Sequence, residues 1–137
     1  MKRLLSLCLL ITPTTALADG FGFMTPSGNI YCNGYISGGG GVSCTIVEKT
    51  GAPAKPKPNS CTGVWGHDFE LEGSGVATMS CNTWPGGPKK VNYTDIATYG
   101  VSAEFGDITC TSEQTGFSCR NKSGHGFSLS RRSQKTF

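Results

Sequence analysis

The sequence has 137 residues, of which 36% are hydrophobic and 15% are charged, and its formal net charge is +3. This length indicates a single domain with a modest hydrophobic core. No stretch approaches the roughly 20 apolar residues that a membrane-spanning helix requires, so the composition excludes an integral helical membrane protein.

The N-terminus has the three parts of a secretory signal peptide. Lys2 and Arg3 form a charged region, residues 4–11 form a short apolar stretch, and Ala16-Leu17-Ala18 forms a small-x-small cleavage site. We therefore expect residues 1–18 to be a signal peptide and residues 19–137 to be the secreted domain. The localisation that this predicts is periplasmic or secreted, and loss of Lys2 and Arg3 would lower the formal charge from +3 to +1.

The rest of the chain predicts short strands separated by glycine and proline turns. Residues 28–35 and 41–47 alternate as strands do, with a glycine-rich turn between them, and residues 51–60 carry three prolines that favour an extended surface connection. Residues 65–72 and 76–81 predict a second hairpin, residues 91–99 are β-prone and polar, and residues 127–130 predict a last strand. We find no helical apolar periodicity, so the fold class is all-β, a small sandwich or barrel built from hairpins.

Four of the seven cysteines lie in two copies of one pattern. Each copy reads Gly-Asn/Asp-Ile-x-Cys and then Gly-apolar-Ser-Cys, and the copies span residues 28–44 and 106–119. This predicts two hairpins with a cysteine on each arm, hence the disulfides Cys32–Cys44 and Cys110–Cys119, which leaves Cys61–Cys81 as the third pair. Disulfides of this kind form in oxidising compartments and each is worth about 2–4 kcal/mol, so we expect the fold to need them.

The residues that could carry chemistry are few. There are only two histidines, and neither a Cys-x-x-Cys, a His-Glu-x-x-His nor a Gly-x-Ser-x-Gly motif occurs, so we expect no cofactor, no metal site and no catalytic residue. Glu70 and Glu72 could serve as paired carboxylates, but their alternation with Phe69 and Leu71 favours a solvated strand face. Export makes a nucleic-acid partner unexpected.

Charge is unevenly distributed in the second half of the chain. Residues 68–113 contain seven acids and two bases, whereas residues 114–137 contain five bases and no acid. The basic end would favour an anionic partner, although a solvated surface strand is the simpler explanation.

Four side chains are candidate ligand-binding residues. His125 lies between two glycines, which can bring an imidazole close to a ligand. Arg131 offers a planar guanidinium with several donors, and because it lies six residues after His125 on a predicted strand, both side chains can point to the same face. Trp84 lies in a proline- and glycine-rich loop. Arg120 is a supporting candidate, because it belongs to the basic C-terminal segment. The alternatives are a turn histidine, a structural arginine and a tryptophan that belongs to the core.

Several segments together resemble an uncharacterised family of secreted bacterial proteins. The opening segment, residues 23–32, follows the pattern Phe-x-Ser/Thr-Pro-Ser-Gly-Asn-Ile-x-Cys, and residues 124–131 read Gly-His-Gly-Phe-Ser-Leu-Ser-Arg. Further matches are residues 41–44, 61 with 65–66, 99–100 and 116–121, whereas the glycine run at 38–41 departs from the family pattern. The resemblance implies export, one domain and three disulfides, and it implies no activity.

We therefore expect an exported, disulfide-stabilised, non-enzymatic binding module that is a monomer and has an envelope or extracellular partner. One alternative is an inhibitor of a secreted hydrolase, such as a lysozyme or a peptidase, that acts through a rigid loop. A third hypothesis is a small hydrolase that uses His125.

Overall fold

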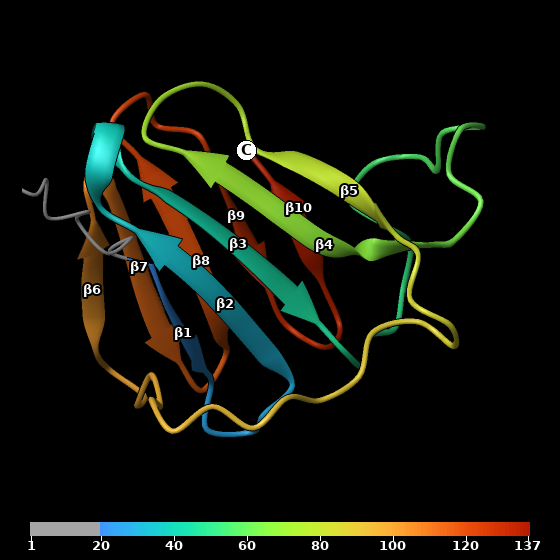
Figure 1. Cartoon of the computed structure of the whole chain (residues 1–137), viewed down its shortest axis with the longest axis horizontal. Helices are drawn as coiled ribbons and strands as arrows, with labels where there is room; N and C mark the ends of the chain where they lie inside the picture. The colour runs from blue at the N-terminus through green and yellow to red at the C-terminus, as the bar shows by residue number, and fades with distance from the viewer. Residues whose placement is uncertain (1–19) are drawn as a thin grey trace, which may run out of the picture.

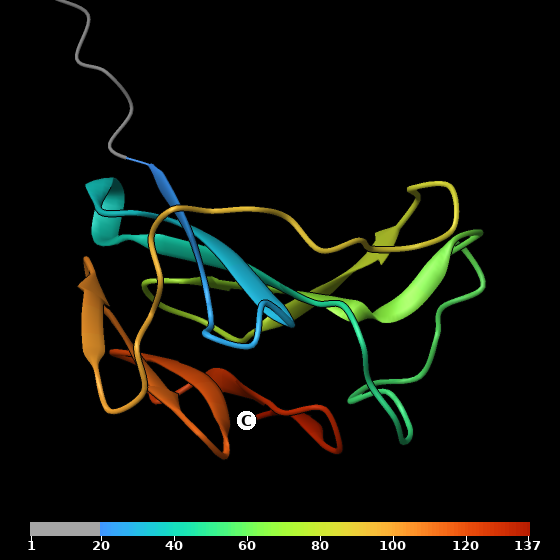
Figure 2. The same cartoon turned by 90° about the horizontal axis from the view of Figure 1, so that it is seen from below.

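The computed structural model describes residues 20–137, which form ten strands in two antiparallel five-stranded sheets. The sheets pack face to face as a sandwich (Figure 1, Figure 2). The all-β prediction is confirmed, and of its two forms the sandwich is the one observed. The predicted signal peptide, residues 1–18, lies outside the described residues. Within residues 20–137 we find no helix of the length and hydrophobicity that crossing a bilayer requires.

Each sheet is a simple meander. Sheet A has the order β1-β2-β3-β4-β5, with bounds β1 Phe21–Met24, β2 Ile30–Tyr35, β3 Gly41–Ile46, β4 Val64–Glu72 and β5 Thr78–Asn82. Sheet B has the order β10-β9-β8-β7-β6, with bounds β6 Ser102–Phe105, β7 Ile108–Glu113, β8 Gly116–Asn121, β9 Gly126–Leu129 and β10 Gln134–Thr136. A short 3-10 turn, Ser37–Gly39, connects β2 to β3.

The two sheets are two copies of one design, because the repeat seen in the hairpins extends to the next strand. In sheet A, Cys44 lies opposite Phe69 and Val42 opposite Leu71. In sheet B, the equivalent Cys119 lies opposite Phe127 and Phe117 opposite Leu129. A Phe-x-Leu pair therefore follows each cysteine hairpin, on β4 and on β9, and its side chains are buried in both copies.

Phenylalanine rings join the two sheets. Phe69 of sheet A meets its counterpart Phe127 of sheet B with ring centroids 5.7 Å apart, and Phe23 meets Phe105 at 5.6 Å and Phe117 at 5.8 Å. These side chains belong to one core cluster between the sheets. Burial of each is worth about 1.5–3 kcal/mol, and aromatic pairs add about 0.5–1.5 kcal/mol.

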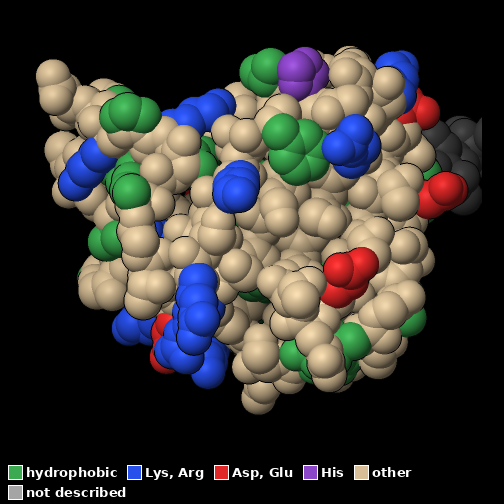
Figure 3. All heavy atoms as spheres, turned by 180° about the vertical axis from the view of Figure 1, so that it is seen from behind, with side chains coloured by type: hydrophobic (Ala, Val, Ile, Leu, Met, Phe, Trp, Pro, Cys, Tyr) green, Lys and Arg blue, Asp and Glu red, His purple; other side chains and the backbone are tan. Residues whose placement is uncertain are grey.

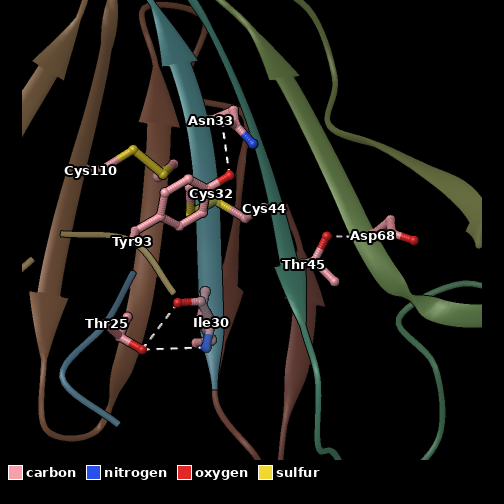
Figure 4. The surroundings of a disulfide bond; sticks show 10 residues. Thr25, Ile30, Cys32, Asn33, Cys44, Thr45, Asp68, Tyr93 and Cys110 are labelled. Carbon is pink, nitrogen blue, oxygen red and sulfur yellow. Dashed lines mark hydrogen bonds between the residues drawn. A yellow bond between two sulfur atoms is a disulfide. The ribbon is translucent and has the colours of Figure 1, made fainter. Parts of the chain in front are cut away.

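All three predicted disulfides are present: Cys32–Cys44, Cys61–Cys81 and Cys110–Cys119. The two hairpin disulfides join directly opposite residues with Cα atoms 4.1 Å apart, and their cysteines are buried in the core. Figure 4 shows the Cys32–Cys44 disulfide beside β2 and β3, with Cys110 nearby. Three disulfides are consistent with an oxidising extracellular or periplasmic environment.

The strand pattern differs from the prediction in four places. The β-prone segment 91–99 is not a strand and pairs only through a bridge between Ile96 and Met24. Its Tyr93 ring instead packs over Gly22, and the hydroxyl donates to Asn33 at 3.3 Å, so the segment covers part of the outer face of sheet A. Strands β1, β6 and β10 were not predicted, and each has only three or four residues.

The glycine run before β3 contacts the other sheet directly. The Asp107 N–H donates to the Gly39 carbonyl at 2.8 Å, which joins the β6–β7 turn of sheet B to the β2–β3 turn of sheet A. A Cβ at Gly40 would lie 1.8 Å from the Phe105 carbonyl oxygen, whereas a Cβ at Gly38 would meet nothing within 4 Å. Glycine is therefore required at position 40 for close approach as well as for its positive φ.

Gly40→Ala and Gly38→Ala form a matched pair, because both residues have a positive φ and only Gly40 is crowded. We expect Gly38→Ala to cost about 1–2 kcal/mol of stability from backbone strain. Gly40→Ala should cost more than about 3 kcal/mol, because the turn must also move away from Phe105. Guanidinium unfolding of the oxidised proteins measures both, and equal losses would show that the glycine contact does not hold the sheets together.

Candidate functional site

The outer face of sheet B carries rows of polar side chains. Because β-strand side chains alternate, the residues between the buried Cys110, Phe117, Cys119 and Phe127 point outward. The strand registers align four outward hydroxyl side chains into one row across four strands, and the row ends at Lys135 on β10. These hydroxyl residues are Ser102, Thr111, Ser118 and Ser128.

A second row runs beside the first and contains Glu104, Thr109 and Arg120. We call the surface formed by both rows, together with Lys135 and the nearby Phe137, the hydroxyl face. In Figure 3, Lys and Arg side chains lie around a broad surface of uncharged polar side chains and backbone on this side of the molecule. The sheet therefore presents hydroxyl groups about 4.8 Å apart, with cationic groups beside them.

The centre of the hydroxyl face is a shallow hollow of about 450 Å³. Its lining contains members of both rows, Thr109, Thr111, Ser118, Arg120 and Ser128, together with Phe137. The guanidinium of Arg120 lies 5.0 Å from the ring centroid of Phe137, in the geometry of a cation–π contact. Among residues 20–137, Arg120 has no acidic partner, so its planar fork remains available to a ligand.

His125 lies at the margin of this face. Its ring Nδ1 is 3.3 Å from the Phe137 carbonyl oxygen, and its backbone N–H donates to the Asn121 side chain at 3.1 Å. The hydrogen bonds of the described residues give its ring no serine or carboxylate partner. The structure therefore brings His125 and Arg120 to the same residue, Phe137.

Asn121 joins the two sheets through its side chain, and it was not predicted from the sequence as a site residue. It is buried, and its side-chain N–H groups donate to the carbonyls of Glu72 at 3.0 Å and Gly75 at 2.7 Å, in the β4–β5 turn of sheet A. Its side-chain oxygen accepts from the N–H groups of Ser123 and His125. Asn121 therefore holds the turn that carries His125 and also joins the two sheets.

Arg131 lies at the opposite end of β9 and does not share a surface with His125. It follows the strand in the β9–β10 turn, and its guanidinium pairs with the Glu48 carboxylate. Both belong to an open polar pocket of about 300 Å³ that Thr25, Ser27 and Asn29 also line. The first and last segments of the family-like pattern therefore meet at this pocket, although they are about 100 residues apart in the sequence.

Much of this end pocket is held by its own hydrogen bonds. Asn29 forms two bonds with the backbone of Glu48, as donor at 2.9 Å and as acceptor at 2.7 Å. Thr25 bonds with the backbone of Ile30, and the Thr50 N–H donates to the Arg131 carbonyl at 2.8 Å. These polar side chains therefore have structural partners already, unlike Arg120 on the hydroxyl face.

Trp84 is 75% exposed, in the loop after β5. With Tyr31, Lys89 and Val91 it lines a separate apolar pocket on the side of sheet A. By contrast, Trp65 is half-buried, and its indole N–H donates to the Lys55 carbonyl at 2.8 Å. The four predicted residues therefore occupy three places: His125 with Arg120, Arg131 alone, and Trp84 alone.

The remaining electrostatic features are local. Tyr35 donates its hydroxyl to the Glu72 carboxylate at 2.6 Å, and this bond raises the pKa of Tyr35, with burial and the carboxylate charge acting in the same direction. Tyr35 is neutral at neutral pH and can donate this bond there, and the raised pKa means that its hydroxyl keeps the proton to a higher pH than a free tyrosine does. No group of three potential metal ligands occurs within residues 20–137.

Replacement of Asn121 and of Arg131 by alanine compares the contribution of a buried, hydrogen-bonded side chain to stability with that of a surface ion pair. Asn121→Ala leaves buried carbonyls without donors, and we expect a loss of about 2–3 kcal/mol. Arg131→Ala removes a pair whose side chains are 64% and 52% exposed, and we expect a change below about 1 kcal/mol. Denaturant unfolding tests both, and a larger loss for Arg131→Ala than for Asn121→Ala would show that the end pocket holds the sheets together.

Comparison with known proteins gives a family without an assigned activity. No curated protein and no solved structure matched the chain. The sequence model of a family of unknown function (DUF6636) matches residues 3–137. The chain therefore belongs to this family of unknown function, as its resemblance to an uncharacterised family implied.

Proposed function

We propose that the protein is an exported, non-enzymatic binding module and that its ligand-binding surface is the hydroxyl face of sheet B. The observation that carries the proposal is Arg120, whose guanidinium is held over the Phe137 ring at 5.0 Å and has no acidic partner among residues 20–137. A cation that is oriented but not neutralised is suited to bind an anionic group.

The surroundings of Arg120 indicate the kind of ligand. The hydroxyl row can both donate and accept hydrogen bonds, as the hydroxyl groups of a sugar do. Lys135 ends this row, and His125 lies beside Phe137, so an ammonium group and an imidazole flank the hydroxyls. We infer that the ligand is an acidic polysaccharide, whose carboxylates meet Arg120 and Lys135 while its hydroxyls meet the serine and threonine row.

Trp84 and Arg131 lie away from this surface, so the proposed site keeps two of the four predicted residues, Arg120 and His125. Phe137 and the hydroxyl row join them. A uronic acid chain several sugars long would cross the strands along the row, where it could reach both Arg120 and Lys135.

Binding to polygalacturonate, with neutral dextran as the comparison polymer, tests this proposal. We expect the domain to be retained by polygalacturonate, less so at high salt, and Arg120→Ala to weaken binding by about tenfold or more. Lys89→Ala, which removes an exposed cation from the side of sheet A, should change it by less than about twofold. Equal binding of dextran, or unchanged binding by Arg120→Ala, would contradict the proposal.

One observation favours the alternative function, an inhibitor of a secreted hydrolase. Residues 47–63 form a long loop that projects from the sandwich (Figure 1), and the Cys61–Cys81 disulfide fixes its end to β5. The Lys55 Nζ of the loop donates to the carbonyl of Ala77, just before β5, at 3.0 Å. Proline content and these bonds restrict the loop, and a restricted loop binds with a smaller loss of entropy.

Titration of a lysozyme and a serine peptidase with the protein distinguishes the two functions. Inhibition that is lost in a Pro56→Gly/Pro58→Gly variant and retained in Arg120→Ala would favour the inhibitor. The third hypothesis, a hydrolase that uses His125, has no comparable observation, since the hydrogen bond of its ring is to a backbone carbonyl.

A further inference from the structure

The edge strand β6 has a row of exposed backbone groups. β6 is the last strand of sheet B, and three of its four residues, Ser102, Ala103 and Glu104, are exposed. An unpaired edge of this kind is a template for another strand.

The strand register shows which backbone groups point away from the sheet. Cys110 and Cys119 are 4.1 Å apart, the spacing of a pair that does not exchange backbone hydrogen bonds, so the backbone groups of Cys110 face β6. Cys110 lies opposite Ala103, and these two residues therefore bond to each other. By alternation, the N–H and C=O groups of Ser102 and Glu104 point outward from the edge.

An apolar slot opens beside the same strand. It has a volume of about 230 Å³ and is lined by side chains of both edge strands, β1 and β6, and of the preceding connection. The lining includes Phe21, Phe105, Ile96, Val101 and Ala103. Sites for whole small molecules usually begin near 300 Å³, so this slot has the size for a single apolar side chain.

The charge around the slot is negative. Asp95 is part of its lining, and Glu104 is exposed on β6. The sequence contains no Lys or Arg between residues 91 and 119, and Asp107 at the end of β6 already pairs with Lys122 at 3.3 Å. A strand that pairs with β6 would place alternate side chains beside the slot and beside Glu104, because strand side chains alternate.

We propose that β6 and the apolar slot bind an extended, antiparallel peptide segment of a partner protein, in which apolar and basic residues alternate. Its main chain pairs with Ser102 and Glu104, one apolar side chain fills the slot, and its basic side chains face Glu104. This site adjoins the hydroxyl face, because the side chains of Ser102 and Glu104 belong to that face. It differs from that face in using the outward backbone groups of β6 and the slot on the core side of sheet B.

The test uses the mature domain and a capped, fluorescein-labelled pentapeptide, Lys-Phe-Lys-Val-Lys, followed by fluorescence anisotropy. In the antiparallel arrangement, the N–H of the central lysine bonds to β6 and that of the phenylalanine points away. We therefore expect N-methylation of the central lysine to weaken binding by about tenfold or more, and N-methylation of the phenylalanine to change it by less than about twofold.

Variants of the protein test the same backbone hydrogen bonds on the β6 strand. Ser102→Pro removes an outward N–H, and Ser102→Ala keeps it, so only the proline variant should lose about tenfold in affinity. Thr136→Pro on β10, the opposite edge, should bind as the wild type does. Should Ser102→Pro fail to fold, Ala103→Glu supplies the test by placing a charge in the slot, and it should weaken binding equally.

Three results would overturn the proposal. These are no binding of the peptide, equal effects of the two N-methylations, or unchanged affinity in both Ser102→Pro and Ala103→Glu. Sedimentation of the protein alone supplies a further outcome: a dimer that Ser102→Pro abolishes would assign the edge to a second copy of this chain and not to a partner. Binding of polygalacturonate by the wild-type protein is measured separately, so failure of this proposal can be distinguished from failure of the proposed function.

Discussion

The two buried disulfides of the hairpins fix which side chains of β2, β3, β7 and β8 face the core. Each joins directly opposite residues, Cys32 with Cys44 and Cys110 with Cys119, whose sulfurs lie in the core. A one-residue shift of either hairpin would turn its cysteines to solvent, so the crosslink excludes the alternative registers. Once Cys110 and Cys119 point inward, Thr109, Thr111, Ser118 and Arg120 must point outward. The burial of these cysteines in the core therefore also determines which side chains of β7 and β8 belong to the hydroxyl face.

The two sheets contact each other in two ways, through large aromatic side chains and through glycine backbones. Large rings fill the middle, where Phe69 and Phe127 meet, whereas at one end glycine backbones approach directly, as Gly39 and Gly40 do against the β6–β7 turn. Asn121 adds hydrogen bonds at that end, which satisfy carbonyls of the β4–β5 turn. The turns are therefore packed elements of the fold, and the departure of the glycine run from the family pattern falls at a structural contact.

The fold could be predicted largely because its signals are local and repeated. Cysteine spacing gave the disulfides, and alternation in Phe69-Glu70-Leu71-Glu72 gave the buried and exposed faces of β4. Pairing between distant segments has no such signal: the β1 strand and the bridge of Met24 with Ile96 depend on tertiary contact. The candidate site was predicted less well for the same reason. Arg120 and His125 were recognised singly, but Phe137, which joins them, and the hydroxyl row become visible only when the registers of five strands are known.

Duplication makes the differences between the two sheets informative, because both copies satisfy the same core. In sheet A, the β5–β6 connection lies over the outer face through Tyr93, and the β3–β4 connection is a long loop fixed by a third disulfide. In sheet B, the β8–β9 connection is a tight turn, and the outward residues Thr109 and Arg120 are exposed. Stability does not require an unneutralised arginine over an aromatic ring, since the same core in sheet A forms without one. The features that the repeat leaves unexplained, the hydroxyl face and the acidic edge of β6, are therefore where selection for binding would act.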